Sequence, residues 1–393
     1  MHIKSSLFAI WLAFYGFVLI GLSGGANGIL IPSLSAFYHV GDAVIGLLFL
    51  VSSSGYFLSA LSSSLFIERI GLRWFLVGGS LAVLLGLLPF GLQMPFWLLL
   101  IARLIEGFGV GIVETGLNVF ITSLPRNTSL LNTLHAFYGA GALLGPLVAS
   151  AILAASWGWQ NVYWLLAVLA LLLVPGFTTL FHSSHMPSNT EKQAGKENVL
   201  FATLKLPVVW IVTLFLLVYV GLEVSLGNWA FSFLTTSRHQ GTLLASWVVS
   251  GFWLGLTVGR FTLYRLAERM GVSARKLMSL CIIGIGISLV LIWLLPSSII
   301  AGIGFCLVGL CLAPIYPMTV AITPTLVDSR LSASAIGILV SVSILGLALF
   351  PWIAGIAAQF VGIWTLLPYT LGLTVVLMGF WYALTRHNPQ VKV

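Results

Sequence analysis

Long apolar runs separated by short polar breaks recur along the whole chain. Twelve of these runs have about the length that a helix needs to cross a bilayer, so each is predicted to be a transmembrane helix. The first run continues for about 25 residues without a small-x-small cleavage site, so it is interpreted as a span and not as a signal peptide. The predicted helices cover residues 7–33, 43–66, 72–92, 95–123, 131–155, 160–181, 207–234, 242–267, 274–295, 297–323, 331–358 and 362–385.

The one long polar segment, FHSSHMPSNTEKQAGKENV at residues 181–199, separates six predicted helices from six. It predicts an N-terminal six-helix bundle (1–181), a cytoplasmic linker (182–206) and a C-terminal six-helix bundle (207–393). The halves share a short repeat, since Glu68-Arg69-x-Gly71 recurs as Glu268-Arg269-x-Gly271 at an offset of 200 residues. Parallel six-helix repeats around a central pathway are a transporter architecture.

Composition supports an all-α membrane protein. The chain is 59% hydrophobic and 7% charged, with a mean hydropathy of +1.10, whereas soluble domains carry about 25% charged residues. The lipid bilayer is therefore its expected partner, and the net charge of +8 does not indicate nucleic-acid binding. Cys281, Cys306 and Cys311 lie in apolar runs without the spacing of a metal site or disulfide framework, so neither a metal nor a cofactor is expected.

The basic residues predict the orientation, because cytoplasmic loops are enriched in Lys and Arg. If the N-terminus is cytoplasmic, the outer loops hold only Arg238, and Arg103 and Arg260 lie inside spans. Both termini are therefore expected in the cytoplasm, and the protein in the inner (plasma) membrane. The basic residues then assigned to the cytoplasmic side are Lys4, Arg69, Arg73, Arg126, Lys192, Lys196, Lys205, Arg265, Arg269, Arg275, Lys276, Arg330, Arg386 and Lys392.

Three stretches resemble signatures of the major facilitator superfamily. The stretch from Ser64 to Arg73 is similar to the loop between spans 2 and 3, which in the family latches the two bundles on the cytoplasmic side. The stretch from Arg103 to Gly111 is similar to the span 4 signature of an arginine followed by spaced glycines. Gly139 to Pro146 is similar to a glycine-proline signature of antiporters, although small residues are common at any membrane helix crossing. The resemblance implies the major facilitator fold.

A narrower resemblance is to the branch that contains fucose permease and the glucose/proton symporters. It implies that Glu114 couples transport to protons and, more loosely, that His135 and Tyr138 contribute to the sugar site. In one place the chain departs from the pattern, because fucose permease has an aspartate where this chain has Gly28. If that aspartate is needed, coupling here must use Glu114 alone or with Glu223, or be absent. The resembling stretches are Glu114–Asn118, Leu131–Gly139, Tyr219–Glu223, Gly259–Phe261 and Ala313–Pro317.

Charged residues inside spans are costly and usually face a bundle interior or a wet cavity. Here they are Arg103, Glu106, Glu114, Glu223 and Arg260. Arg103 and Glu106 have the spacing of a structural pair. Glu114 lies about 20° from Arg103 on one helix face but roughly 16 Å away along the axis, too far for a direct salt bridge. Without a cation nearby in the sequence, Glu114 can exist protonated, as a proton carrier must. Glu223 is either a second coupling residue or a packing partner of Arg260, which can also snorkel toward the cytoplasm.

Polar and aromatic residues near these charges complete the predicted site. Trp253, Tyr56 and Tyr316 offer the flat faces and hydroxyls that sugar sites use, although aromatic residues in apolar helices usually serve packing. The candidate substrate-binding residues are Asn27, Asn118, His135, Tyr138, Asn228, Trp253 and Tyr316. The candidate structural or gating residues are Glu68, Arg69, Gly71, Arg73, Arg103, Arg260, Glu268 and Arg269.

These patterns predict a monomeric secondary transporter that moves a monosaccharide or similar polar solute together with protons, by alternating access. The alternative is a proton-driven exporter of drugs or metabolites; an uncoupled facilitator or a receptor-like member also stays open. An enzyme is not expected. Gly21-Leu-Ser23-Gly24 matches the GxSG of intramembrane serine proteases, but His135 is predicted at the opposite side of the membrane.

Overall fold

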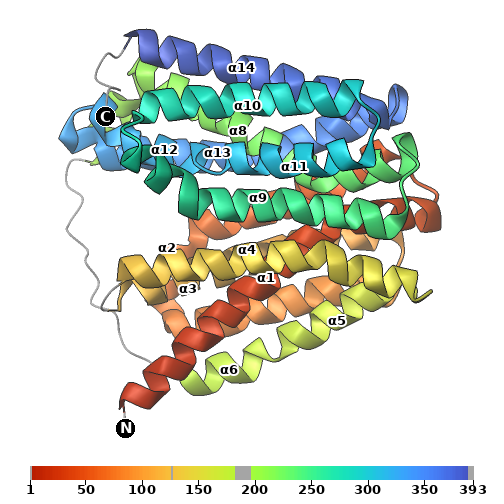
Figure 1. The fold of residues 1–393 in the computed structure, drawn as a ribbon. Helices are drawn as coiled ribbons and strands as arrows, with labels where there is room; N and C mark the ends of the chain where they lie inside the picture. The colour runs from red at the N-terminus through yellow and green to blue at the C-terminus, as the bar shows by residue number, and fades with distance from the viewer. Residues whose placement is uncertain (1, 125–126, 182–195, 388–393) are drawn as a thin grey trace. The chain divides into compact units, whose positions relative to one another are not determined.

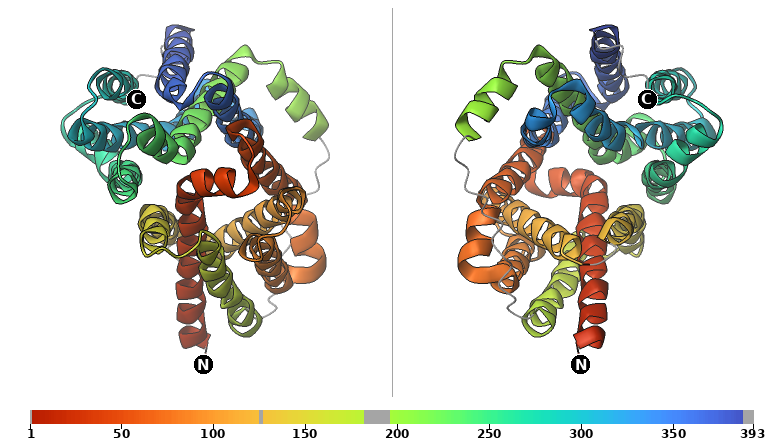
Figure 2. Two further views of the ribbon diagram at one scale, coloured as in Figure 1. Left: turned by 90° about the vertical axis from the view of Figure 1, so that its right-hand side faces the viewer. Right: turned by 90° about the vertical axis from the view of Figure 1, so that its left-hand side faces the viewer.

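The computed structural model describes residues 2–124, 127–181 and 196–387, and every regular element in these ranges is helical (Figures 1 and 2). The chain forms two compact units, Met1–Ser188 with Gly241–Ser246, and Asn189–Gln240 with Trp247–Val393. Each of the twelve predicted spans coincides with helix, so the predicted all-α membrane fold is confirmed. Large apolar side chains such as Leu85, Ile287 and Val375 are exposed, as expected where lipid is the solvent.

The N-terminal unit contains six labelled helices. In Figure 1 they run from red to yellow-green. The most extensive contacts join α2 to α3 and α1 to α4. Glycines permit these close approaches: a Cβ at Gly107 of α3 would overlap the carbonyl oxygen of Ser52 in α2, so only a residue without a side chain fits. The helices are α1 (His2–Tyr38), α2 (Asp42–Gly91), α3 (Phe96–Thr122), α4 (Asn127–Ala154), α5 (Gln160–Leu171) and α6 (Leu173–Leu180).

Helix α2 accounts for two of the predicted spans. Among the described residues, eleven helical segments are long and apolar enough to cross a membrane, and α2 with its 50 residues is the longest. Its path turns at Gly71, whose φ of 77° and ψ of 158° are not helical. Glycine adopts this backbone region without the steric cost that a Cβ brings. Two helices therefore meet at Gly71, and counting them separately gives the twelve spans expected.

Prolines divide two other predicted spans. The span predicted at residues 160–181 is split between α5 and α6, because Pro175 cannot donate a hydrogen bond to Leu171 and its ring crowds that carbonyl. The span predicted at 297–323 is split at Ala313–Pro314 into α11 and α12. Each proline breaks the helix without ending the crossing.

The C-terminal unit is built around α8, which is mostly apolar and packs most extensively against α13 and α14. Its side chains Phe215, Tyr219 and Trp229 are fully buried, as expected for a helix enclosed by others. Its elements are α8 (Pro207–Ser232), the π-helix η1 (Phe233–Ser237), α9 (Thr242–Arg269), α10 (Ala274–Leu294), α11 (Ser298–Leu312), α12 (Ile315–Ile322), the 3₁₀ turns η2 (Thr323–Leu326) and η3 (Ser329–Leu331), α13 (Ser332–Phe360), η4 (Ile363–Thr365) and α14 (Leu366–His387).

The predicted linker differs in one respect from the structure. Its described part contains a short helix, α7 (Lys196–Leu204), where the sequence analysis expects none. The segment KENVLFATL contains several residues with good helix propensity. It begins with polar residues, so a prediction based on long apolar runs does not include it. The rest of the linker, residues 182–195 including Lys192, lies outside the described residues, as do Arg126 and Lys392.

Candidate functional site

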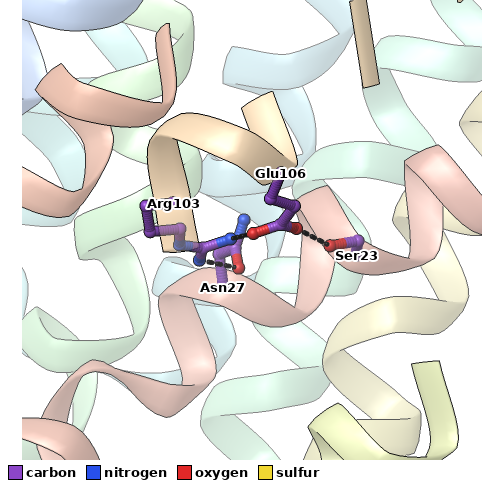
Figure 3. Close-up of polar contacts among 4 residues, drawn as sticks. All are labelled: Ser23, Asn27, Arg103 and Glu106. Carbon is purple, nitrogen blue, oxygen red and sulfur yellow. Dashed lines mark hydrogen bonds and ion pairs between the residues drawn. The ribbon is translucent and has the colours of Figure 1, made fainter. Parts of the chain in front are cut away.

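A polar network joins α1 and α3 inside the N-terminal unit (Figure 3). Arg103 forms an ion pair with Glu106, three residues later on α3, and Arg103 Nη2 also donates to Asn27 Oδ1 at 2.6 Å. Ser23 Oγ, one turn before Asn27 on α1, donates to Glu106 Oε1 at 3.3 Å. Arg103 is 4% and Glu106 3% exposed, so the predicted pair is present, and each charge is compensated by its partner rather than by water.

Aromatic rings complete the surroundings of Arg103. Its guanidinium carbon lies 5.1 Å from the centroid of the Phe90 ring, a cation–π geometry. Phe90 in turn stacks on Tyr163 of α5 with ring centroids 4.5 Å apart. The sequence pattern does not single out Phe90 or Tyr163, and Ser23 stands out in it only as part of a protease-like motif. Ser23 instead holds the Glu106 carboxylate.

Glu114 has a different environment from Glu106. It lies two turns further along α3, is half-buried, and accepts a hydrogen bond from the Tyr56 side chain of α2. The Tyr56 ring lies over Gly111, where a Cβ would be 3.2 Å from Cδ2 of the ring. The ideal-helix prediction places Arg103 and Glu114 on one face, but Arg103 reaches Asn27 of α1 while Glu114 reaches Tyr56 of α2.

The other candidates of this unit lie on α3 and α4. Asn118, one turn after Glu114, is half-buried, and its main-chain carbonyl accepts a hydrogen bond from the Thr122 hydroxyl at 2.9 Å. His135 packs edge-on against Phe17 of α1, with ring centroids 5.4 Å apart. Tyr138 is also held against α1, since its hydroxyl lies 3.7 Å from the position of a Cβ on Gly24. These residues therefore line the contact between α1 and α4 or lie beside Glu114.

A second polar cluster lies in the C-terminal unit. Tyr219 and Glu223 are one turn apart on α8, and the Tyr219 hydroxyl donates to the Glu223 carboxylate. Arg260 of α9 places Nη2 3.6 Å from Glu223 Oε1. The ring of Tyr316 in α12 lies 6.4 Å from that of Tyr219. The structure thus shows the pairing of Glu223 with Arg260 that the sequence gives as one alternative, and it adds Tyr316, which the sequence proposes separately.

Trp253 and Asn228 lie together further along the same two helices. Both are 8% exposed. The six-membered ring of Trp253 covers Gly227, where a Cβ would lie 2.9 Å from Cζ2, so the glycine next to Asn228 makes room for the indole. Within the described residues, the buried Nε1–H of Trp253 has no hydrogen-bond partner. A buried N–H without a partner is an available donor for a polar ligand.

Six of the candidate structural or gating residues lie in the two segments of the internal repeat, at the Gly71 kink of α2 and at the end of α9. Gly71 has a φ of 77° and Gly271 a φ of 65°, so both glycines of the repeat have a positive φ. Glu68, Arg69, Glu268 and Arg269 are all exposed beside these glycines. Arg73 is half-buried, with its guanidinium carbon 5.2 Å from the centroid of the Trp74 ring.

Fold and site together define a multi-pass membrane protein with ion-paired charges inside helical bundles. The family model described as Major Facilitator Superfamily matches residues 13–242 and 224–393. The chain therefore belongs to the Major Facilitator Superfamily and is a membrane transporter.

Relatives and solved structures agree with this assignment. The chain is 26% identical over 381 residues to Bypass of stop codon protein 6 of Saccharomyces cerevisiae, covering 88% of this chain and 76% of the relative. It is 22% identical over 320 residues to the glucose/mannose transporter GlcP of Bacillus subtilis, covering 79% of each. The crystal structure of nucleoside transporter NupG superposes with a TM-score of 0.79 at 15% identity, covering 99% of this chain and 100% of that one. At that identity the likeness shows the fold alone.

Proposed function

We propose that this transporter is a symporter that moves a monosaccharide, or a similar small polar solute, together with protons. Glu114 is the proton-binding residue in this proposal. The protein works as a monomer in the inner (plasma) membrane, with both termini in the cytoplasm, and without a cofactor.

The observation that carries the proposal is the difference among the three glutamates inside the spans. Glu106 lies against Arg103, and Glu223 lies against Arg260. Glu114 contacts the neutral Tyr56 hydroxyl. An arginine neighbour stabilises the ionised form of a carboxylate. Beside a neutral group there is no such stabilisation, and removal from water then favours the protonated, neutral form. Glu114 is accordingly the glutamate best suited to change charge during a transport cycle.

Tyr56 suits both charge states of Glu114. Its O–H donates to the ionised carboxylate, and its oxygen can accept from the protonated acid, since a tyrosine hydroxyl is both donor and acceptor. Neither state leaves the half-buried carboxyl group without a hydrogen bond. In the proposed cycle Glu114 takes a proton in the outward state, and only the neutral form lets the loaded carrier close and reorient.

Support for a sugar comes from the polar groups and from one relative. Each unit by itself holds polar groups of the kind that bond sugar hydroxyls. They are Asn118, His135 and Tyr138 in the N-terminal unit, and Asn228 and the Trp253 Nε1–H in the C-terminal unit. GlcP, which is 22% identical over 79% of this chain, is named as a glucose/mannose transporter. The resemblance of the Glu114–Asn118 stretch to the branch of fucose permease and the glucose/proton symporters favours the same class.

The test is uptake by the purified protein in liposomes with an imposed inward proton gradient and a panel of hexoses and deoxyhexoses. We expect one of them to accumulate, and a protonophore to abolish the accumulation. Glu114→Gln should still exchange labelled for unlabelled sugar while losing accumulation, because its neutral amide mimics only the protonated state. If Glu114→Gln accumulates sugar as well as the wild type does, the coupling residue is wrong. Export of drugs without sugar uptake would contradict the substrate class.

A further inference from the structure

The thiols of Cys281 and Cys311 lie next to each other where α10 packs against α11. Cys281 of α10 is 4% exposed and Cys311 of α11 is half-buried, and both are free thiols. Their side chains are in hydrogen-bonding contact. Helices α10 and α11 follow each other along the chain and pack together in the C-terminal unit. Neither thiol belongs to the candidate sugar or proton site.

The packing at Gly284 is a second observation that locates the Cys311 thiol beside α10. Gly284 lies three residues after Cys281 and so on the same face of α10. A Cβ at Gly284 would be 2.8 Å from Cys311 Sγ, closer than real Cβ contacts. The missing side chain therefore leaves the space that the Cys311 thiol occupies next to Cys281.

The third cysteine of the chain points elsewhere. Cys306 lies five residues before Cys311, which on an ideal helix turns it about 140° away. Its carbonyl oxygen lies against Gly255 of α9, and its Cβ is 4.0 Å from the position of a Cβ on Gly251. Cys306 thus faces α9 rather than α10, and it provides a matched control within the same helix.

The thiol pair lies beside a break in the helix. Cys311 is the second-last residue of α11, before the interruption at Ala313–Pro314, and α12 begins at Ile315. Tyr316, the next residue of α12, lies against Tyr219, which bonds Glu223. A covalent link at Cys311 would therefore fix the segment from which the candidate-site residue Tyr316 extends.

We propose that Cys281 and Cys311 form an oxidation site that a hydroperoxide converts into an intramolecular disulfide. One thiol reduces the peroxide and becomes a sulfenic acid, releasing an alcohol or water. The second thiol then displaces water from the sulfenic sulfur, so that the two thiols supply the two electrons that the peroxide accepts. The disulfide ties α10 to α11 next to the Ala313–Pro314 break and slows the transport cycle.

Disulfide mapping tests the site without reference to transport. The full-length protein in liposomes is treated with hydrogen peroxide or tert-butyl hydroperoxide, remaining thiols are alkylated, and peptides are identified by mass spectrometry. We expect a linked Cys281–Cys311 peptide pair that disappears on reduction. The pair should persist in Cys306→Ser and be lost in Cys281→Ser and in Cys311→Ser. Gly284→Ala should lower its yield by displacing the Cys311 thiol.

Other outcomes would overturn the proposal. Alkylation of both thiols after peroxide treatment, or linkage of either one to Cys306, would show that the pair is not an oxidation site. The effect on transport rests on the proposed sugar uptake. Peroxide should reduce initial uptake by the wild type and by Cys306→Ser, with recovery on reduction, but not by Cys281→Ser. Linkage without loss of uptake would refute the control of transport, and failure of the reduced protein to take up any sugar would refute only the proposed function.

Discussion

Arg103 and Glu106 form an ion pair within one turn of α3, and the same guanidinium bonds Asn27 of α1. Both side chains are nearly inaccessible, at 5% and 3% exposure. Removing one partner leaves a buried charge without compensation, which typically costs about 3–5 kcal/mol, whereas removing both charges costs much less. We expect Glu106→Gln to lower the thermal unfolding midpoint in detergent clearly, and Arg103→Met/Glu106→Leu to recover part of the loss.

An exposed pair of the same type provides the control. Arg330 and Asp328 lie 3.5 Å apart with side chains 79% and 69% exposed, and such pairs contribute little to stability. Asp328→Asn should therefore leave the unfolding midpoint unchanged. Equal effects of Glu106→Gln and Asp328→Asn would show that burial does not strengthen the Arg103 pair.

Tyr56→Phe removes the hydroxyl that donates to Glu114 without changing the ring over Gly111. Donation to a carboxylate favours its ionised form, so its loss makes protonation easier. We expect the pH of half-maximal sugar uptake to move upward by up to about one unit, the equivalent of one hydrogen bond of roughly 1 kcal/mol. Uptake measured over a series of pH values, in Tyr56→Phe and in the wild type, checks this shift. A downward or absent shift would contradict the role of Tyr56 at Glu114.

The sequence predicts the helices well, because apolar length alone decides where a chain can cross a membrane. It also predicts the pair of Arg103 with Glu106, whose spacing lies within one helix. Contacts between different helices are harder to predict from the sequence. The approach of Tyr56 to Glu114 depends on α2 and α3 packing at Gly107 and Gly111, and no pattern along a single helix gives that register.

The helix breaks near Pro175 and Pro314 are also hard to predict from the pattern of apolar residues. Pro175 and Pro314 are visible in the sequence, but an apolar run that continues past each proline indicates only that the span continues. Whether a proline kinks or divides the helix depends on neighbours that resatisfy the freed backbone groups. The structure divides both spans, and at the second break it brings Tyr316 to Tyr219.

Glu223 and Glu114 should respond differently to neutralisation. Tyr219 and Arg260 both stabilise the Glu223 carboxylate. The Arg260 side chain is 32% exposed, so its charge is not left fully buried and unpaired when Glu223 becomes glutamine. We expect Glu223→Gln to retain gradient-driven accumulation at a lower rate, while Glu114→Gln loses it. Accumulation ratios in the liposome assay separate the two. Loss of accumulation in Glu223→Gln, with sugar exchange intact, would assign coupling to both glutamates.

Gly71 and Gly78 lie on the same labelled helix, and alanine should affect them in opposite directions. A Cβ at either position meets nothing within 4 Å, but Gly71 has a φ of 77° whereas Gly78 lies in regular helix. A residue with a Cβ pays about 1–3 kcal/mol to adopt the backbone conformation of Gly71, while alanine replaces glycine in a helix with a gain of up to about 1 kcal/mol. Thermal unfolding should show Gly71→Ala less stable and Gly78→Ala at least as stable as the wild type. Gly271→Ala should also be less stable than the wild type, because Gly271 has a positive φ of 65°. A Gly271→Ala protein as stable as the wild type would show that the positive φ at Gly271 is not retained by glycine alone.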